Sequence, residues 1–219
     1  MEVYEEIKKY ELILCSSSPR RKDILKQIGF DPIIIKSKFA EDLDKSKYND
    51  PIKYVEDTSF YKIMDIYENI HNINNNSSNN LKPKILLSAD TVIICNNKIF
   101  EKPLNFENNV KMIKELRNFQ KNGYKILIVT CCTLIKILIN GKFTSKKFKS
   151  ISEIHLIDNL SDLIIEEYCK SGEGLEVAGG FKIQGKGAIL FDFIKGDFYN
   201  CVGLPASLVF EQISEIIND

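Results

Sequence analysis

Apolar strand-like runs alternate with amphipathic helical segments along almost the whole chain, and this alternation limits the possible folds most strongly. The strand-like runs cover residues 11–15, 32–37, 84–95, 124–139, 143–156 and 187–195, and a short one lies near 198–202. Helical spacing of apolar residues marks 19–28, 51–69, 106–117, 160–170 and 205–217. Alternating strands and helices are typical of an α/β fold, in which helices pack on a shared sheet.

Short turn signals indicate a mixed sheet rather than a purely parallel one. Asn140-Gly141 joins two long strand-like runs and predicts a type I′ hairpin, and Asn96-Asn97 predicts another two-residue turn. A further tight turn is expected at Lys195-Gly196-Asp197. Hairpins place neighbouring strands antiparallel, so we expect a mixed sheet flanked by helices.

The length and composition fit one domain spanning residues 1–219. Hydrophobic residues make up 44% of the chain, which is enough for a sizeable core. The formal net charge is zero, so overall charge favours neither nucleic acid nor an acidic membrane as a partner. No run of about 18 apolar residues occurs, and the N-terminus lacks the basic and apolar regions of a secretory signal. We therefore expect a cytoplasmic protein without a membrane span.

The six cysteines suit buried thiols rather than a metal or redox site. None forms a C-x-x-C pair, and the chain has only two histidines, so the spacing of zinc ligands is missing. Most of the cysteines lie in apolar strand-like runs, where small thiols pack well in a reducing compartment. Cys131 and Cys132 are adjacent in one run, so their side chains should point to opposite faces and form no disulfide.

Two polar stretches lie outside the alternating pattern. The Asn-rich tract at 72–82 cannot bury apolar surface, so we expect a disordered surface loop there. A basic run beside the Asn140-Gly141 turn contains Lys142, Lys146, Lys147 and Lys149. We interpret this run as a solvated hairpin face, with RNA binding as the alternative.

The segment Ser16-Ser17-Ser18-Pro19-Arg20-Arg21 directly follows the first apolar strand. Pro19 suits the first position of a helix, and Ser18 before it is a good N-cap. A helix N-terminus has free N–H groups and a partial positive charge, so two arginines beside it would favour a polyanion. An ordinary capped helix with solvated arginines is the alternative.

Asp90 interrupts an otherwise apolar strand. A carboxylate there has to be hydrogen-bonded, bound to a metal or placed at a cleft, because an isolated buried charge is costly. A structural aspartate bonded to backbone N–H groups is the alternative. The turn at Asn96-Asn97 would return Lys102 towards the same end of the sheet as Asp90.

Glycines are dense between residues 174 and 187 and recur between Gly196 and Gly203. Glycine lets the backbone approach a ligand closely. Within the first of these segments, Gln184 offers a donor and an acceptor that could read the edge of a base. A structural glycine-rich loop is the alternative.

Five motifs in one order give the chain its resemblance to a known family. They are Ser16 to Arg21, Ala89-Asp90-Thr91, Lys102-Pro103, Ala178 to Gly185, and Gly196 to Pro205. In this order and spacing the chain resembles the Maf family of nucleoside triphosphate pyrophosphatases, from about Leu12 to the last helix.

The resemblance implies both a fold and a reaction. The fold is an elongated mixed β-sheet flanked by helices, with two lobes around a deep cleft, as in inosine triphosphate pyrophosphatases. The reaction is hydrolysis between the α- and β-phosphates of a nucleoside triphosphate, which releases the monophosphate and pyrophosphate with the help of Mg²⁺ or Mn²⁺. The family also suggests a homodimer.

The resemblance also assigns roles to the residues that match the motifs of the family. Catalytic roles are expected for Asp90, Lys62 and Lys102, metal contacts for Glu41 and Asp90, and substrate contacts for Ser16, Ser18, Arg20, Arg21, Thr91 and Gln184.

Two alternatives concern the substrate and the activity. Arg20, Thr91 and Gln184 resemble the branch of the family that favours dTTP, UTP and modified pyrimidine nucleotides. Phe181-Lys182 resembles the branch that favours 7-methyl-GTP, which is the alternative substrate. A regulatory module that binds nucleotides without turnover is the alternative from another class.

Overall fold

The computed structural model describes residues 2–74 and 82–218. The helices are α1 (Glu2–Ile7), α2 (Pro19–Gln27), α3 (Pro51–Asn74), α4 (Phe106–Lys121), α5 (Asp162–Lys170), α6 (Phe198–Val202) and α7 (Ala206–Asn218). The strands are β1 (Glu11–Leu14), β2 (Ile33–Ile34), β3 (Lys84–Cys95), β4 (Lys98–Phe100), β5 (Ile126–Ile137), β6 (Phe143–Leu156) and β7 (Phe191–Lys195). Short 3₁₀ helices are η1 (Lys45–Lys47), η2 (Ala178–Gly180) and η3 (Lys186–Leu190).

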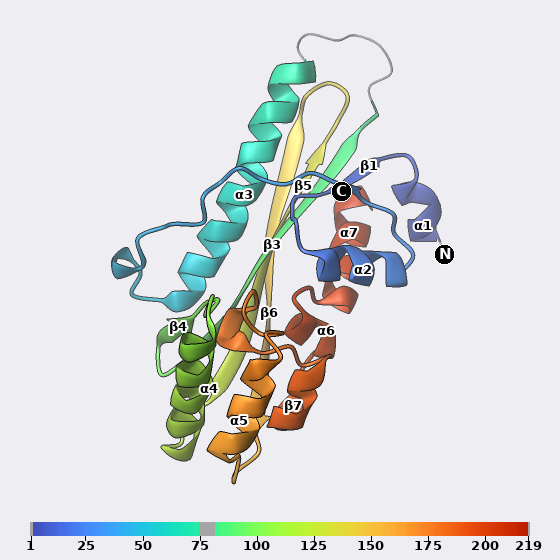
Figure 1. Cartoon of the computed structure of the whole chain (residues 1–219). Coiled ribbons are helices and arrows are strands. Elements are labelled where there is room, and N and C mark those ends of the chain that lie inside the picture. Colours follow the sequence, from blue (N-terminus) through green and yellow to red (C-terminus); the bar gives the residue numbers. More distant parts are fainter. Residues whose placement is uncertain (1, 75–81, 219) are drawn as a thin grey trace.

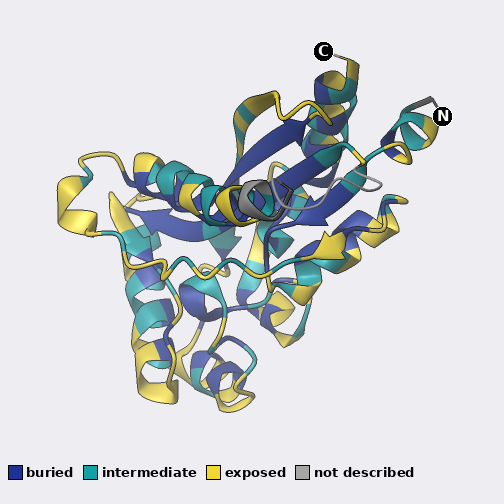
Figure 2. Cartoon of the chain, turned by 90° about the horizontal axis from the view of Figure 1, so that it is seen from above, coloured by how far each residue is buried: buried dark blue, intermediate teal, exposed yellow. Residues whose placement is uncertain are grey.

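The strands form one mixed sheet, which confirms the α/β fold with a mixed sheet. The strand order is β2-β1-β3-β5-β6-β7, and β4 pairs with β3 off this path. β1 runs parallel to β2 and β3, whereas the β3–β5, β5–β6 and β6–β7 pairs are antiparallel. The long strands β3 and β5 run through the length of the molecule and are almost wholly buried, and the view from above shows dark blue, buried strands in its interior (Figure 1, Figure 2).

Helices cover the two faces of the sheet in different ways. One face lies under the single long helix α3, which packs on the sheet near β1 through Ile63 and Ile66 and near β4 through Tyr54 and Val55. On the other face, α1, α2 and α7 cover the half near β1, while α4 and α5 cover the half near β4. This divided face produces two lobes that share the long strands (Figure 1).

The outer edge of β3 changes its strand partner between the two lobes. Pairing with β1 ends at Leu87, and pairing with β4 begins at Ile93. In the described chain, residues 88–92 therefore pair with β5 alone. Side chains alternate along a strand, so Asp90 faces α3 and Thr91 faces the divided side. Two polar side chains thus point in opposite directions from one short open edge.

Residues 198–202 form the helix α6, so the expected short strand there was wrong. Asp197 caps this helix by accepting a hydrogen bond from Tyr199 N at 2.8 Å, and Gly203 ends it with φ +117°. The expected turn at 195–197 consequently joins a strand to a helix, not to another strand. Residues 187–190 were also expected in a strand but belong to η3, and the N-terminal helix α1 was not expected at all.

The hairpin between β5 and β6 is confirmed, but its turn is not of type I′. That turn type needs positive φ at both central residues. Here Gly141 has φ +80° and Asn140 does not have a positive φ. Leu138 N donates to Lys142 O at 2.8 Å, and Gly141 N donates to Leu138 O at 2.9 Å. The loop therefore contains three residues, in which only the glycine takes the left-handed conformation.

Two further expectations concern the Asn-rich tract and the cysteines. Helix α3 continues to Asn74, so residues 72–74 are helical, and 75–81 lie outside the described residues. All six cysteines are free. Cys131 and Cys132 pack into clusters on opposite faces of the sheet, as predicted. No helix within residues 2–74 and 82–218 is both long enough and apolar enough to span a membrane.

Candidate active site

A cleft of about 820 Å³ opens where the edge of β3 is unpaired. Its walls come from segments far apart in the chain: the N-terminus of α2, the segment between β2 and α3, the edge of β3, and the loops after β4, α5 and α6. The expected site residues that line it are Ser16, Ser18, Arg20, Arg21, Glu41, Lys62, Asp90, Thr91 and Lys102.

On the α3 side of the cleft, one lysine lies between two carboxylates. Lys62 Nζ donates to Asp90 Oδ1 at 2.7 Å and lies 2.8 Å from Glu41 Oε2. The Lys62 and Asp90 side chains are only 7% and 11% exposed, whereas Glu41 is 54% exposed. Burial strengthens the attraction between these charges and makes each one costly to leave unpaired. The resemblance to the Maf family suggested Lys62 by its position, and in the structure Lys62 contacts Asp90.

Glu41 reaches Lys62 because of the path of the β2–α3 segment (residues 35–50). Asp65, one turn after Lys62 in α3, accepts hydrogen bonds from Lys38 N at 2.8 Å and Ser37 Oγ at 3.0 Å. Glu41 itself has φ +57°, which is uncommon for a residue other than glycine. The anchored start of the segment and this local reversal direct the carboxylate back to α3.

On the divided side of the cleft, Arg21 is held by neutral acceptors. Its Nε donates to Gly203 O at 2.9 Å, Nη1 to Ser16 Oγ at 3.1 Å and Nη2 to Thr91 Oγ1 at 3.1 Å. Arg21 is only 9% exposed. Within the described residues it makes no ion pair, so its charge is not neutralised by the protein.

The start of α2 supplies further groups that suit an anion. Pro19 occupies the first turn and Ser18 the N-cap position, as predicted, but the Ser18 side chain makes no capping bond. Instead, Ser16 Oγ accepts a hydrogen bond from Ser18 N at 3.2 Å. Burial, and after it the charge of Arg21, lower the pKa of the Arg20 guanidinium from its ordinary value. Arginine nonetheless remains a cation in proteins.

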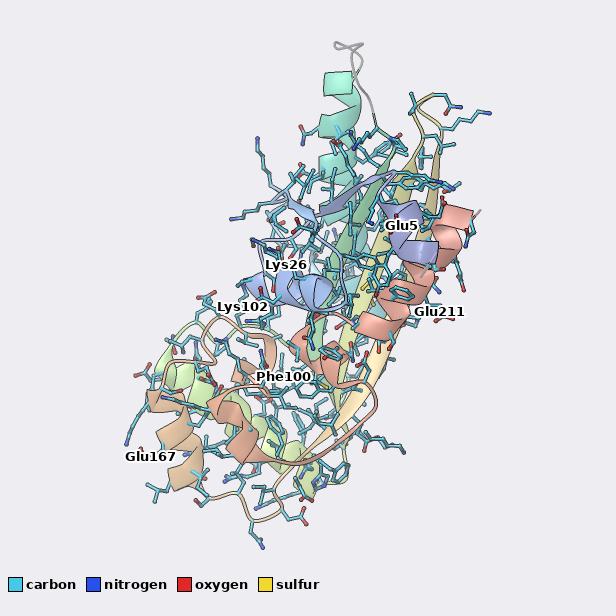
Figure 3. The ribbon with its side chains drawn as sticks, turned by 90° about the vertical axis from the view of Figure 1, so that its right-hand side faces the viewer. Glu5, Lys26, Phe100, Lys102, Glu167 and Glu211 are labelled. Atoms are coloured by element: carbon cyan, nitrogen blue, oxygen red, sulfur yellow. The ribbon has the colours of Figure 1, made fainter. Side chains whose placement is uncertain are left out.

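Lys102 lies at the boundary between the lobes (Figure 3). Its side chain is 57% exposed, and Nζ lies 3.6 Å from Glu176 Oε2 across the cleft mouth. The turn at Asn96-Asn97 has positive φ at both residues and returns the chain antiparallel to β3, as expected. Lys102 thus shares the cleft with Asp90 but is not in contact with it.

Sequence reasoning missed Glu101 and Tyr54 in the wall of the cleft. Glu101 accepts a hydrogen bond from Tyr54 OH at 2.9 Å and lies 2.6 Å from Lys45 Nζ. Burial, followed by the bond to Glu101, raises the pKa of the Tyr54 hydroxyl. Through these contacts Glu101 joins β4, α3 and the β2–α3 segment. The position of Glu101 directly before the expected site residue Lys102 could have indicated that this carboxylate lies in the cleft wall.

Gln184 does not join the other expected substrate residues. Its side chain is exposed and lies outside the residues that line the cleft. Its neighbour Ile183 packs into the core of the α4–α5 lobe, which turns Gln184 outward. The same loop reaches the cleft instead through Val177, Ala178 and Phe181.

The basic run at 142–149 does not form one continuous patch. Lys146 pairs with Glu215 of α7, on one face of the sheet. Lys149 lies 3.1 Å from Glu56 of α3, and Lys147 Nζ lies 3.9 Å from the centre of the Phe60 ring, on the other face. The alternation of side chains along β6 divides this run between two faces.

The donor set near Asp90 suits a hard divalent cation. Mg²⁺ is commonly held by one or two carboxylates, together with waters and phosphate oxygens of the substrate. Asp90 and Glu41 approach one point from two sides, because both contact Lys62 Nζ. No group of three or more His, Cys, Asp or Glu side chains in the described chain could hold a metal. These residues therefore suit a cation that is bound jointly by the two carboxylates and by phosphate oxygens of a ligand. They suit a cation bound by protein ligands alone less well.

Comparisons with known proteins agree with the family resemblance of the motifs. A dTTP/UTP pyrophosphatase from Saccharomyces cerevisiae is 41% identical over 94% of this chain and 90% of its own length. Proteins of the same name from Schizosaccharomyces pombe and Pyrococcus furiosus are 35% and 34% identical, over 98% and 93% of this chain and 87% and 94% of their own lengths. Residues 11–216 match the family described as Maf-like protein. The chain belongs to the Maf family.

Proposed function

We propose that this protein is a nucleoside triphosphate pyrophosphatase that hydrolyses dTTP and UTP, and modified pyrimidine nucleotides, to the monophosphate and pyrophosphate. The names of its relatives support this substrate choice. The observation that carries the proposal is the open edge of β3. From that edge Asp90 meets Lys62, which also contacts Glu41, while Thr91 meets Arg21, which has no acidic partner among the described residues.

The two sides of the cleft suit two parts of one reaction. Water attacks the α-phosphorus, the bond from that phosphorus to the bridging oxygen breaks, and pyrophosphate leaves with its electron pair. We assign Asp90 to orient the water and accept its proton, since its carboxylate is fixed by Lys62. Arg20, Arg21 and Lys102 would offset the charge of the triphosphate and of the leaving group.

A divalent cation belongs to this proposal. When bound, it would polarise the phosphate and offset the charge that develops during the reaction. Asp90 and Glu41 are the residues that would hold it. Lys62 contacts both carboxylates and would keep them together before substrate arrives.

The base would lie against the lobe formed by α4 and α5. The cleft lining there is apolar and includes Ile93, Ile128 and Phe181. Since Gln184 faces away from the cleft, base selection through that side chain stays a prediction to be tested by substitution. Gln184→Glu would weaken pyrimidine nucleotides more than 7-methyl-GTP if Gln184 reads the base.

One assay separates the candidate functions. The purified protein is incubated with Mg²⁺ or Mn²⁺ and dTTP, UTP, CTP, GTP, ATP or 7-methyl-GTP, and pyrophosphate and orthophosphate are measured separately. We expect pyrophosphate from dTTP and UTP. Pyrophosphate mainly from 7-methyl-GTP would change the substrate and keep the reaction. Nucleotide binding without any product would identify a binding module and overturn the proposal.

A further inference from the structure

The guanidinium of Arg21 is held so that part of it remains available to a ligand. It carries five N–H groups in a rigid plane. Three of its hydrogen bonds go to Gly203 O, Ser16 Oγ and Thr91 Oγ1, one from each nitrogen. One N–H on each terminal nitrogen is left for a phosphate oxygen. The direction of those two groups depends on how firmly the three acceptors hold the plane.

Of the three acceptors, only Thr91 is itself held by a further buried hydroxyl. Thr91 Oγ1 lies 3.0 Å from Thr130 Oγ1, and Thr130 Oγ1 donates to Asn200 O at 3.4 Å. Each hydroxyl has a single hydrogen. The order Arg21 to Thr91 to Thr130 to Asn200 O satisfies every donor in the chain.

Thr130 lies behind Thr91 and outside the cleft lining. It pairs with Thr91 across the β3–β5 ladder, is completely buried, and is not among the residues that line the cleft. At the far end of the chain, the Asn200 amide donates to Ile128 O at 3.0 Å and to Ser152 Oγ at 2.9 Å. The relay therefore runs from the sheet and α6 to the guanidinium.

We propose that Thr130 is a positioning residue that directs the Arg21 guanidinium towards a polyphosphate through Thr91. This inference rests on one part of the proposed function, namely that the cleft binds pyrophosphate or a triphosphate. Without the Thr130 hydroxyl, Thr91 can turn its hydrogen to Gly203 O, 3.3 Å away, and would then share that carbonyl with Arg21 Nε. Thr91 Oγ1 would then no longer be fixed by Thr130, and its bond to Arg21 Nη2 would constrain the guanidinium plane less firmly.

The test uses the full chain, Mg²⁺ and inorganic pyrophosphate as the probe. Thr130→Val removes the hydroxyl at nearly constant volume, and Thr130→Ser restores it. Thr133→Val is the matched control, because Thr133 is also buried in β5 but bonds Ser59 at 3.1 Å, away from Arg21. Binding is measured by calorimetry and folding by thermal unfolding.

We expect Thr130→Val to raise the pyrophosphate Kd about three- to tenfold, the range that one net hydrogen bond spans. KM for dTTP should rise by a similar factor with kcat nearly constant, since ground-state binding is what changes. Thr130→Ser and Thr133→Val should stay within about twofold of the wild type. In a Thr91→Val background, Thr130→Val should have no further effect, because the relay is already broken.

Several results would overturn the positioning role. They are a wild-type Kd for Thr130→Val, a Thr130→Ser variant as weak as Thr130→Val, and an undiminished effect of Thr130→Val in the Thr91→Val background. A wild-type protein that does not bind pyrophosphate would also overturn it. A wild type that binds pyrophosphate with the expected pattern but hydrolyses no nucleotide would refute the proposed function and leave the positioning role standing.

Discussion

The two sides of the cleft hold their buried cations in opposite ways. Lys62 lies between two carboxylates, Asp90 and Glu41, so its charge is more than balanced before any ligand binds. Among the described residues, the acceptors of Arg21 are hydroxyl and carbonyl oxygens, so its charge is fixed in place but not balanced there. A cation with its own counter-ions organises carboxylates, whereas a cation with neutral partners remains free to attract an anion.

The same short edge of β3 produces this contrast. Asp90 and Thr91 are adjacent, and strand geometry directs them to opposite faces. One face is covered by α3, which brings a lysine, and the other meets α2 and the end of α6, which bring an arginine and a carbonyl. Substitutions on the two sides should therefore have different kinetic consequences.

The largest effect is expected on the carboxylate side. Asp90→Asn keeps the shape of the side chain but cannot accept a proton from water, so kcat should fall by roughly 10³-fold, within the range for loss of a general base. Folding should persist because Glu41 still faces Lys62. Pyrophosphate release and thermal unfolding measure the two effects. Asp162→Asn, which changes an exposed carboxylate on α5, is the control, and a normal kcat for Asp90→Asn would remove Asp90 from the chemistry.

A smaller but substantial loss is expected on the arginine side. Arg21→Lys keeps the charge, but an ammonium cannot bond three acceptors in one plane and still present two donors. We expect kcat/KM for dTTP to fall about 10²-fold, comparable to the loss of one preorganised donor. Arg117→Lys, at a half-buried arginine that donates to Leu160 O in the other lobe, should leave kcat/KM close to wild type. Equal losses in the two variants would show that Arg21 acts through stability alone.

A third substitution separates metal binding from proton transfer. Glu41→Gln removes one of the two charges facing Lys62 and should raise the Mg²⁺ concentration needed for half-maximal activity about tenfold, as for loss of one charged contact. Activity at saturating Mg²⁺ should recover most of its wild-type value. Glu56→Gln, at a carboxylate paired with Lys149, serves as the control. An unchanged Mg²⁺ requirement would remove Glu41 from the cation site.

The smallest effect on activity is expected from iodoacetamide treatment aimed at Cys201, which lies in the cleft wall. Burial raises the pKa of its thiol to about 11. The thiol is therefore neutral at pH 8, and its thiolate fraction increases as the pH rises towards that value. Iodoacetamide should modify Cys201 about 100-fold more slowly in the native protein than in urea, and activity should be retained. Peptide mass spectrometry follows the reaction, and rapid native labelling would contradict a neutral thiol.

Much of the architecture could be predicted because it depends on local patterns. Apolar runs such as 84–95 and the turn at Asn96-Asn97 predicted β3 and its hairpin. Pro19 predicted the start of α2. Residues 198–202 were misassigned because an apolar and aromatic run suits a short strand or a helix equally. The N-cap at Asp197 and the left-handed Gly203 at the C-terminus favour the helix.

The sequence alone determined which residues carry charge and in which segments they lie. Its motifs identified Arg21, Asp90 and Lys102 as candidates, and strand alternation predicted that Cys131 and Cys132 face opposite sides of the sheet. Only the tertiary structure decided which cation meets which acceptor. The Glu41 carboxylate reaches Lys62 because Glu41 itself takes the left-handed conformation, and Thr130 contacts Thr91 across a strand pair. Gln184 faces outward because its neighbour enters the core. These outcomes depend on contacts between segments distant in sequence, where spacing along the chain carries no information.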